Sequence, residues 1–245
     1  MKRLILLLSL VFLSSLIVHF PLSLVAKYFP KIPKLELTSP SGTVWQGSFY
    51  SVQWDKKNLG SLAWKFNPIQ MLLGRLNVDF TLDGQPNISA KGNAGLSFSG
   101  AYVKNMQLDL ASSFIDTFIR YPLPISSTGT ISFTIDDYQV AEPWCEKLQG
   151  IGRWNDASLI LPIGVVNLGD VSAKLGCSAG SILLTASSDS NQLETEVSLS
   201  FSPTMRYKLE GSLAAKDNLP QAIRSQLKWL GQPDQQGRYK LAFSG

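Results

Sequence analysis

The chain has 245 residues, of which 44% are hydrophobic and 16% charged, so it is long and apolar enough to bury a core and is not wholly disordered. The formal net charge of +4 comes mostly from Lys2, Arg3 and Lys27, since residues 1–27 contain no acid. The remaining residues are nearly neutral and their basic side chains are scattered, so nucleic acid is not an expected partner.

The first element is an uncharged apolar stretch from Leu4 to Ala26. At about 1.5 Å per residue, a helix of this length can cross a hydrocarbon core of about 30 Å. A cleaved signal peptide is the alternative, because basic residues precede the apolar run, but Leu24 before Ala26 is a poor cleavage pattern. We predict a transmembrane signal-anchor helix over residues 4–26, after a cytoplasmic tip of residues 1–3.

Basic residues flank this predicted span on both sides, so their count alone does not decide its orientation. A short charged leader before an apolar run is typical of a signal-anchor, which exports the long C-terminal body. In a bacterium the anchor would then cross the inner membrane once, and the body would lie in the periplasm. Residues 27–34 are expected to link the anchor to one β-rich domain over residues 35–245.

The next feature is the segment Ser41-Gly42-Thr43-Val44-Trp45-Gln46-Gly47. It holds no metal ligand set, no nucleophile with a base and no phosphate loop. Two glycines around an aromatic residue indicate tight backbone turns, with Trp45 packing on the folded body. We therefore expect this motif to be structural.

Period-two alternation dominates the body, as in Leu76, Val78, Phe80 and Leu82, which alternate with polar residues. Such alternation predicts strands with one buried face and one wet face. Similar short runs, separated by turn-forming residues, lie at residues 50–54, 62–66, 106–110, 131–135 and 197–201. The fold class is therefore mainly β: the transmembrane helix is followed by an elongated, curved antiparallel sheet with two short helices.

The first of these helices is predicted at Asn67-Pro68, where Asn caps and Pro suits the first helical position, and it ends before Gly74. The second runs from about Pro220 to Leu230, and Gly231 is placed to stop it. We expect both apolar faces to pack against the sheet, with a partner's groove as the alternative.

The two helices also follow similar segments, Gly60-Ser61-Leu62-Ala63 and Gly211-Ser212-Leu213-Ala214. Each unit then reads strand, helix, strand. Two such copies indicate related modules near both ends of one sheet, although chance similarity is an alternative.

Cys145 and Cys177 are the only cysteines. An even count in an exported domain favours a disulfide, whereas a cytosolic pair is more often free. Zinc is not expected, because there is no CxxC and the single histidine, His19, lies in the apolar segment. The bridge would stabilise the fold by about 3 to 4 kcal/mol in the chain-entropy model.

Catalytic motifs are missing from the sequence. No histidine outside the apolar segment can act as a general base, and no GxSxG, GxGxxG or GxxxxGK[ST] occurs. Asp136 and Asp137 are adjacent in a strand-like stretch, so their side chains should point to opposite faces. We expect no catalytic residue, no cofactor, no metal and no small-molecule substrate, and predict that the chain is not an enzyme.

Several of these features together resemble the type II secretion system protein N family. They are the short basic tip with one span, the Gly42 to Gly47 motif, and the run from Leu59 to Phe66 followed by Asn67-Pro68. The late cysteine pair and the ending from Leu230 to Tyr239 are similar too, so the resemblance covers nearly the whole chain. It implies a non-enzymatic inner-membrane subunit of the machinery that exports folded proteins across the outer membrane of Gram-negative bacteria. Its partners would be other inner-membrane or periplasmic secretion components.

The family is also similar to the AsmA-like group of anchored periplasmic β proteins, some of which form lipid-conducting grooves. A curved sheet can dock on secretion components through its edges and helices, or guide acyl chains along an apolar face. Periodicity does not distinguish a closed apolar face from an open one. A membrane-anchored carrier of lipids between membranes is therefore the alternative function.

Overall fold

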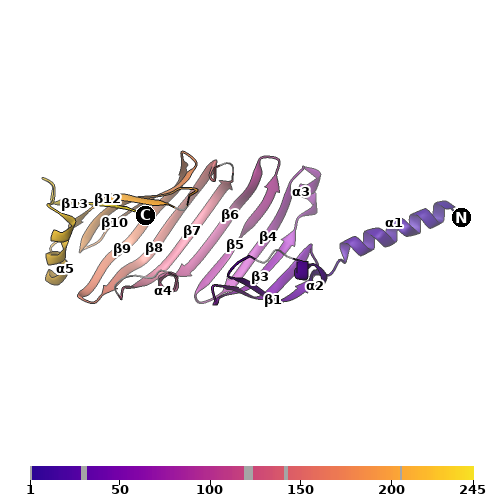
Figure 1. Cartoon of the computed structure of the whole chain (residues 1–245), viewed down its shortest axis with the longest axis horizontal. Coiled ribbons are helices and arrows are strands. Elements are labelled where there is room, and N and C mark those ends of the chain that lie inside the picture. The colour runs from indigo at the N-terminus through magenta and orange to yellow at the C-terminus, as the bar shows by residue number, and fades with distance from the viewer. Residues whose placement is uncertain (1, 29–31, 119–123, 141–142, 205) are drawn as a thin grey trace.

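A single long sheet forms the body of the protein (Figure 1). The computed structural model describes residues 2–28, 32–118, 124–140, 143–204 and 206–245. In these ranges thirteen antiparallel strands lie in chain order, each hydrogen-bonded to the next. The expected mainly β, antiparallel fold is confirmed.

The strands of the first half of the sheet are β1 (Leu35–Gly42), β2 (Gln46–Trp54), β3 (Lys57–Phe66), β4 (Leu76–Gly84), β5 (Ile88–Ser97), β6 (Gly100–Ala111) and β7 (Ser126–Gln139). Those of the second half are β8 (Lys147–Leu161), β9 (Gly164–Ser178), β10 (Ser181–Asp189), β11 (Leu193–Phe201), β12 (Tyr207–Ala215) and β13 (Arg238–Ser244). The helical elements are α1 (Lys2–Val18), α2 (Leu22–Val25), η1 (Ala26–Tyr28), α3 (Pro68–Leu72), α4 (Ser112–Asp116), α5 (Gln221–Gln226) and η2 (Leu227–Leu230).

Strand pairing places the apolar residues of successive strands on one face. Paired residues in an antiparallel sheet point to the same side, so one row can be followed from strand to strand. From β2 to β13 this row contains only apolar residues and glycine: Phe49, Leu62, Leu82, Ala90, Leu108, Phe133, Gly152, Ala173, Ala186, Val197, Gly211 and Leu241. We call this side of the sheet the apolar face.

The neighbouring row points to the other side and is mostly polar. It runs from Ser48 to Ala242 through Ala63, Thr81, Lys91, Gln107, Thr134, Ile151, Lys174, Thr185, Ser198 and Glu210. The predicted alternation between a buried and a wet face is therefore confirmed across the sheet.

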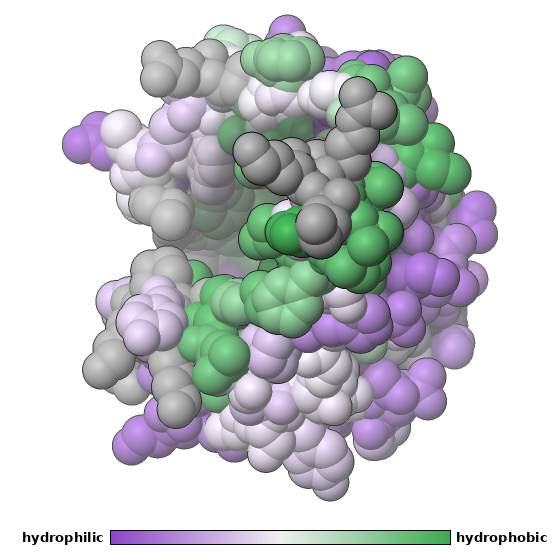
Figure 2. Space-filling model, turned by 90° about the vertical axis from the view of Figure 1, so that its right-hand side faces the viewer, coloured by the Kyte–Doolittle hydropathy of each residue, from purple (hydrophilic) through white to green (hydrophobic). Residues whose placement is uncertain are grey.

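The sheet is curved. Figure 2, which views the molecule from the α1 end, shows a hollow on one side with hydrophobic side chains along its wall. Small residues in the apolar row, such as Ala90, Gly152 and Ala173, leave room on the inside of such a bend. The segment after α4 also reaches past three intervening strands, because Lys57 of β3 lies 4.4 Å from the ring centroid of Phe118.

Short helices cover the two ends of the apolar face. At the first end, Leu22 of α2 is fully buried against Phe49 and Val52 of β2. At the other end, Ile223 of α5 and Leu227 pack with residues of β9 and β11. Between these ends, the face is less covered, and several of its large side chains are only half-buried: Phe80, Met106, Phe133, Leu175 and Leu184.

The N-terminal apolar segment differs from the single helix predicted over residues 4–26. Helix α1 ends at Val18, and α2 begins only at Leu22. Pro21 lies between them, where it has no N–H to continue the helical ladder and instead forms an isolated antiparallel bridge with Thr43. In the part of the chain that the structure describes, no helix combines the length and the apolar character needed to cross a membrane.

The expected tip and linker lie partly in helical elements and partly outside the described residues. Residues 2 and 3 of the expected tip belong to α1, while residue 1 lies outside the described residues. The expected linker over 27–34 begins inside η1, and its residues 29–31 lie outside the described residues. The first strand of the sheet begins at Leu35.

Both predicted strand–helix–strand units are present, as β3–α3–β4 and β12–α5–β13. Asn67 caps α3 as predicted, because its Oδ1 accepts a hydrogen bond from the Ile69 N–H at 3.1 Å. The expectation that both helices pack on the sheet holds for α5 only, since no residue of α3 is buried. Helix α4 was not predicted, because five residues are too few to show helical periodicity.

Candidate functional site

The motif of residues 42–47 forms the tight turn between β1 and β2. Gly42 has φ +85°, a conformation that favours glycine. The Thr43 N–H donates to the Gln46 carbonyl at 2.9 Å, and the Gln46 N–H donates back to Thr43 Oγ1 at 3.1 Å. The threonine side chain thus closes the turn that the glycine begins.

This turn is also joined to the N-terminal helical segment. The Trp45 indole N–H donates to the Ile17 carbonyl at 2.8 Å, where α1 is ending. The Val44 N–H donates to the Phe20 carbonyl at 3.2 Å. The α-helical partner of the Ile17 carbonyl would be the N–H of residue 21, which Pro21 lacks, although the Phe20 N–H also donates to this carbonyl at 3.3 Å. The motif therefore ties the end of α1 to the first hairpin of the sheet.

The other side of the turn contacts the end of β3. The Trp64 indole N–H donates to the Val44 carbonyl at 3.0 Å, and the Phe66 N–H donates to the Trp45 carbonyl at 2.6 Å. The rings of Trp45 and Phe66 have centroids 5.1 Å apart. Trp45 is half-buried, so its predicted packing on the body is observed.

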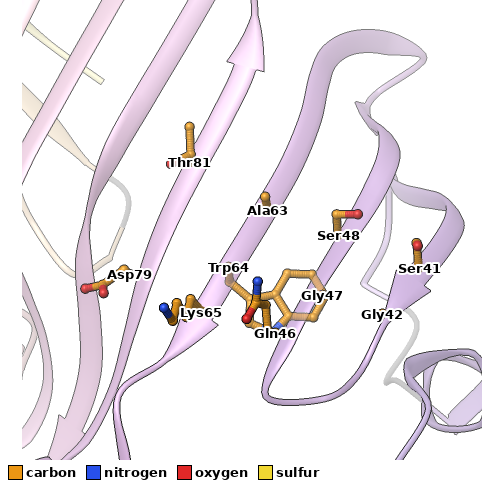
Figure 3. Close-up of a pocket in the computed structure, with 10 residues that line it drawn as sticks. All are labelled: Ser41, Gly42, Gln46, Gly47, Ser48, Ala63, Trp64, Lys65, Asp79 and Thr81. Carbon is orange, nitrogen blue, oxygen red and sulfur yellow. The ribbon is translucent and has the colours of Figure 1, made fainter.

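Gly47 is needed because two groups approach it closely. A Cβ at this position would lie 2.7 Å from the Thr43 carbonyl oxygen and 2.8 Å from Cζ2 of Trp64. Figure 3 shows the Trp64 ring lying beside Gly47 and next to Gln46. Any larger residue would push the tryptophan or the turn aside.

A polar cleft of about 420 Å³ lies beside the motif, on the side of Ser48, Ala63 and Thr81 (Figure 3). Its charged residues are Lys65 and Asp79, which are opposite each other in the β3–β4 register. Asp79 accepts a hydrogen bond from the Asn93 side chain, so its carboxylate is already engaged. The cleft brings together no nucleophile with a base, and within the described ranges no cluster of His, Cys, Asp or Glu can hold a metal ion.

A second, more apolar cleft of about 430 Å³ lies on the other side of the motif. Its lining includes Trp45, Phe66 and the end of α1 at Ile17 and Val18. Pro68 and Met71 of α3 also line it, together with the polar residues Thr43, Gln46 and Lys65. The motif thus stands between a polar cleft and an apolar one, at the point where α1, β3 and α3 meet.

The predicted disulfide between Cys145 and Cys177 is present, with Cα atoms 5.7 Å apart. It joins the segment before β8 to the end of β9. Tyr138 lies nearby and donates its hydroxyl to the Trp144 carbonyl at 3.3 Å. Burial raises the pKa of this tyrosine above its ordinary value, because the phenolate loses solvation.

Asp136 and Asp137 do not form an acid–base pair. Asp136 is exposed, whereas Asp137 is engaged by Lys147 at 2.9 Å and Lys104 at 3.9 Å. The lysines come from β6 and β8, the strands on either side of β7. Asp137 therefore joins three strands on the polar side of the sheet.

Sequence reasoning found the motif but missed the residues that it contacts. Ile17 and Phe20 accept hydrogen bonds through backbone carbonyls, which any residue type could supply. Trp64 and Phe66 were predicted to lie on a strand, and their alternation indicated one face. Nothing in their spacing showed that this face meets the turn at residues 42–47.

The fold and this turn define a class of protein: an extended antiparallel sheet with an apolar N-terminal helix tied to its first hairpin. A sequence profile described as Type II secretion system (T2SS), protein N matches residues 33–242. The chain therefore belongs to the type II secretion system protein N family, whose members are components of that system.

Individual relatives share this name. The chain is similar to the Type II secretion system protein N of Vibrio cholerae serotype O1, with 33% identity over 242 residues, covering 98% of this chain and 96% of the relative. The protein of the same name from Aeromonas hydrophila is 28% identical over 237 residues, with 96% and 94% coverage. That from Klebsiella pneumoniae is 26% identical over 245 residues, with 98% and 94% coverage. No solved structure gives a significant match.

Proposed function

We propose that the chain is a non-enzymatic inner-membrane subunit of the type II secretion system that takes part in export of folded proteins across the outer membrane. The observation that carries this proposal is the family match over residues 33–242, nearly the whole β body. Its partners would be other inner-membrane or periplasmic components of the system. A scaffold role agrees with the motif of residues 42–47, whose contacts stabilise a turn and form no catalytic arrangement.

The proposal includes a single-pass membrane anchor and a periplasmic body. Its support is the uncharged apolar run of residues 4–26 and the outward-facing apolar side chains of α1, such as Leu8, Val11 and Phe12. The disulfide between Cys145 and Cys177 agrees with an oxidising compartment. A C-terminal alkaline phosphatase fusion should be active, whereas an expressed but inactive fusion would contradict the exported orientation.

The functional test is deletion of the gene in a strain that carries the secretion operon, followed by complementation. We expect release of exoproteins to fall and to return with the wild-type gene, while the outer membrane keeps its barrier to dyes. Normal secretion together with a permeable outer membrane would contradict the proposal and favour the second candidate.

The second candidate is a carrier of lipids between membranes, and the continuous apolar face favours it. That face runs from β2 to β13, and several of its large side chains remain half-buried. Figure 2 shows hydrophobic side chains along the wall of the hollow as seen from the α1 end. Acyl chains can lie on such a surface without meeting a charged side chain. Phospholipid that co-purifies with the protein and is lost in Leu184→Glu, but not in the neighbouring Thr185→Glu, would support this candidate.

A further inference from the structure

The helices of the two strand–helix–strand units differ in burial: α5 is packed against the sheet, whereas α3 is exposed. In the C-terminal unit, Ile223 of α5 is 6% exposed because it packs in the core cluster at that end of the apolar face. In the N-terminal unit, Leu72 of α3 is 88% exposed. Both helices carry apolar side chains of similar size. The composition of α3 is therefore typical of a helix that packs on another surface, although no described residue buries it.

The exposed side chains of α3 belong to a larger patch. Phe98, in the turn between β5 and β6, is 97% exposed and its ring lies against Gly74, where an added Cβ would be 2.5 Å from Phe98 Cε2. This contact joins the turn to the segment after α3. We define the α3 patch as the exposed residues Ile69, Met71, Leu72, Leu73, Leu76 and Phe98.

The α3 patch lies where α1 leaves the sheet. Met71 and Pro68 line the same apolar cleft as Ile17 and Val18, the last residues of α1. The Trp45 hydrogen bond to the Ile17 carbonyl holds this end of α1 beside the cleft. The exposed apolar side chains of α1 are therefore followed, across this shared cleft, by those of α3.

The charges around the α3 patch are those expected of a surface that lies next to lipid. Residues 66–78 and 94–103 contain no acidic side chain. Arg75 is the only charged residue within them, and its positive charge suits anionic lipid headgroups. Ordinary exposed faces of this protein instead carry both signs, as in the polar row that holds Lys91, Lys174 and Glu210.

We propose that the α3 patch contacts a lipid surface and lays this edge of the sheet against the membrane that holds α1. The proposal rests on the membrane anchor proposed above. Phe98 and Leu72 would enter the boundary between headgroups and acyl chains, with Trp45 near the same level, as expected for aromatic residues at membrane interfaces. The hollow of the sheet would then begin at the membrane surface, and the sheet would not swing freely on α1.

The test measures depth in the membrane at single labelled positions of the full chain. Cys145 and Cys177 form a disulfide, and the described residues contain no free cysteine, so an introduced cysteine is a unique thiol. The patch variants are Leu72→Cys and Phe98→Cys. Ile163→Cys is the matched control, because Ile163 is an exposed apolar residue in the turn between β8 and β9, on the opposite edge of the sheet. Leu8→Cys reports on α1.

Each variant is labelled with an environment-sensitive fluorophore and reconstituted in vesicles of phosphatidylcholine and phosphatidylglycerol, with or without shallow doxyl-labelled lipid. We expect a blue shift and loss of fluorescence to the doxyl group at positions 72, 98 and 8, and neither at position 163. If the probe at position 8 is quenched but those at positions 72 and 98 give the same signal as the control at 163, this inference is wrong. The proposed membrane anchor would still be supported. No quenching at position 8 would overturn both.

A third result would identify a different occupant. If the probes at 72 and 98 shift to the blue but doxyl lipid does not quench them, a protein surface covers the patch and the lipid proposal is wrong. Repeating the measurement at two protein concentrations would then separate a second copy of this chain from the body of the same molecule.

Discussion

At the scale of single residues, the motif of residues 42–47 works through the backbone. Gly42 supplies a left-handed conformation, Thr43 closes the turn, and the carbonyls of Val44 and Trp45 accept hydrogen bonds from β3. Two groups of the motif reach the N-terminal segment: the Trp45 indole N–H donates to the Ile17 carbonyl, and the Val44 N–H donates to the Phe20 carbonyl. The motif is specific in sequence because Gly42, Thr43, Trp45 and Gly47 each meet a different geometric demand.

Replacing Gly47 with alanine should destabilise the protein by about 1 to 3 kcal/mol, because the added Cβ overlaps the Thr43 carbonyl and the Trp64 ring. Gly176→Ala is the matched control, since a Cβ there meets nothing within 4 Å. It should leave the free energy of unfolding within about 0.5 kcal/mol or raise it slightly. Urea unfolding of the purified chain in detergent measures both, and equal midpoints for the two variants would disprove the packing role of Gly47.

Tyr138 makes stability depend on alkaline pH. Burial raises the pKa of its phenol above the ordinary value of 10.0, so the folded state favours the neutral form. Its contribution is fully present below pH 10 and is lost as the pH rises through the folded-state pKa. Tyr138→Phe should cost about 1 kcal/mol at pH 7, through the lost hydrogen bond to Trp144, and should flatten the alkaline decline. The free energy of unfolding, measured at pH 7 and pH 11, tests this prediction. Tyr50→Phe is the control, because Tyr50 is exposed. If Tyr138→Phe loses as much stability between the two pH values as the wild type does, the prediction is wrong.

At the scale of elements, similar helices have different surroundings at the two edges of the sheet. Strand direction alternates along the chain, so the helix after β3 and the helix after β12 leave from opposite edges. Helix α5 folds back onto the apolar face and buries Ile223, with Leu227 following in η2. Helix α3 stays at the edge occupied by α1, with no buried residue. The strand–helix–strand unit therefore occurs twice, but its helix packs on the sheet in only one of the two copies.

The pair Leu227→Ala and Leu72→Ala compares the same chemical change in these two settings. Leu227 lies in a core cluster, so its truncation should cost about 2 to 3 kcal/mol. Leu72 is exposed, so its truncation should change the free energy of unfolding by less than about 0.5 kcal/mol in detergent. Denaturant unfolding followed by tryptophan fluorescence gives both values. A cost at Leu72 as large as that at Leu227 would mean that α3 packs on the body after all.

At the scale of the whole molecule, the sheet resembles a one-dimensional array. Each strand is hydrogen-bonded to its neighbours in the chain, and among the described residues two clusters of buried hydrophobic residues lie at opposite ends of the sheet. Stability in such an array is close to a sum of local terms, and distant sites act independently. Neither of these two clusters includes residues from all thirteen strands.

This arrangement predicts local rather than global opening. Phe49→Ala, in the cluster with α2, should speed amide hydrogen exchange mainly in β1–β3, and Ile223→Ala should speed it mainly in β9–β13. Mass spectrometry of peptides across the sheet separates the two responses. If either substitution speeds exchange equally along all strands, the sheet is one cooperative unit and the additive description is wrong.

The sequence by itself determined the mainly β character of the body, several of its strands, the face on which their side chains lie, the cap at Asn67 and the pairing of Cys145 with Cys177. These depend on a period of two, on a local cap, or on there being a single pair of cysteines, and a short window of sequence contains that information. Tertiary structure alone decided that Pro21 divides the apolar segment, that Trp45 holds α1, and that α5 is covered while α3 is not. Those outcomes depend on contacts between residues far apart in the chain, where similar apolar side chains can be buried or exposed according to the surface they meet.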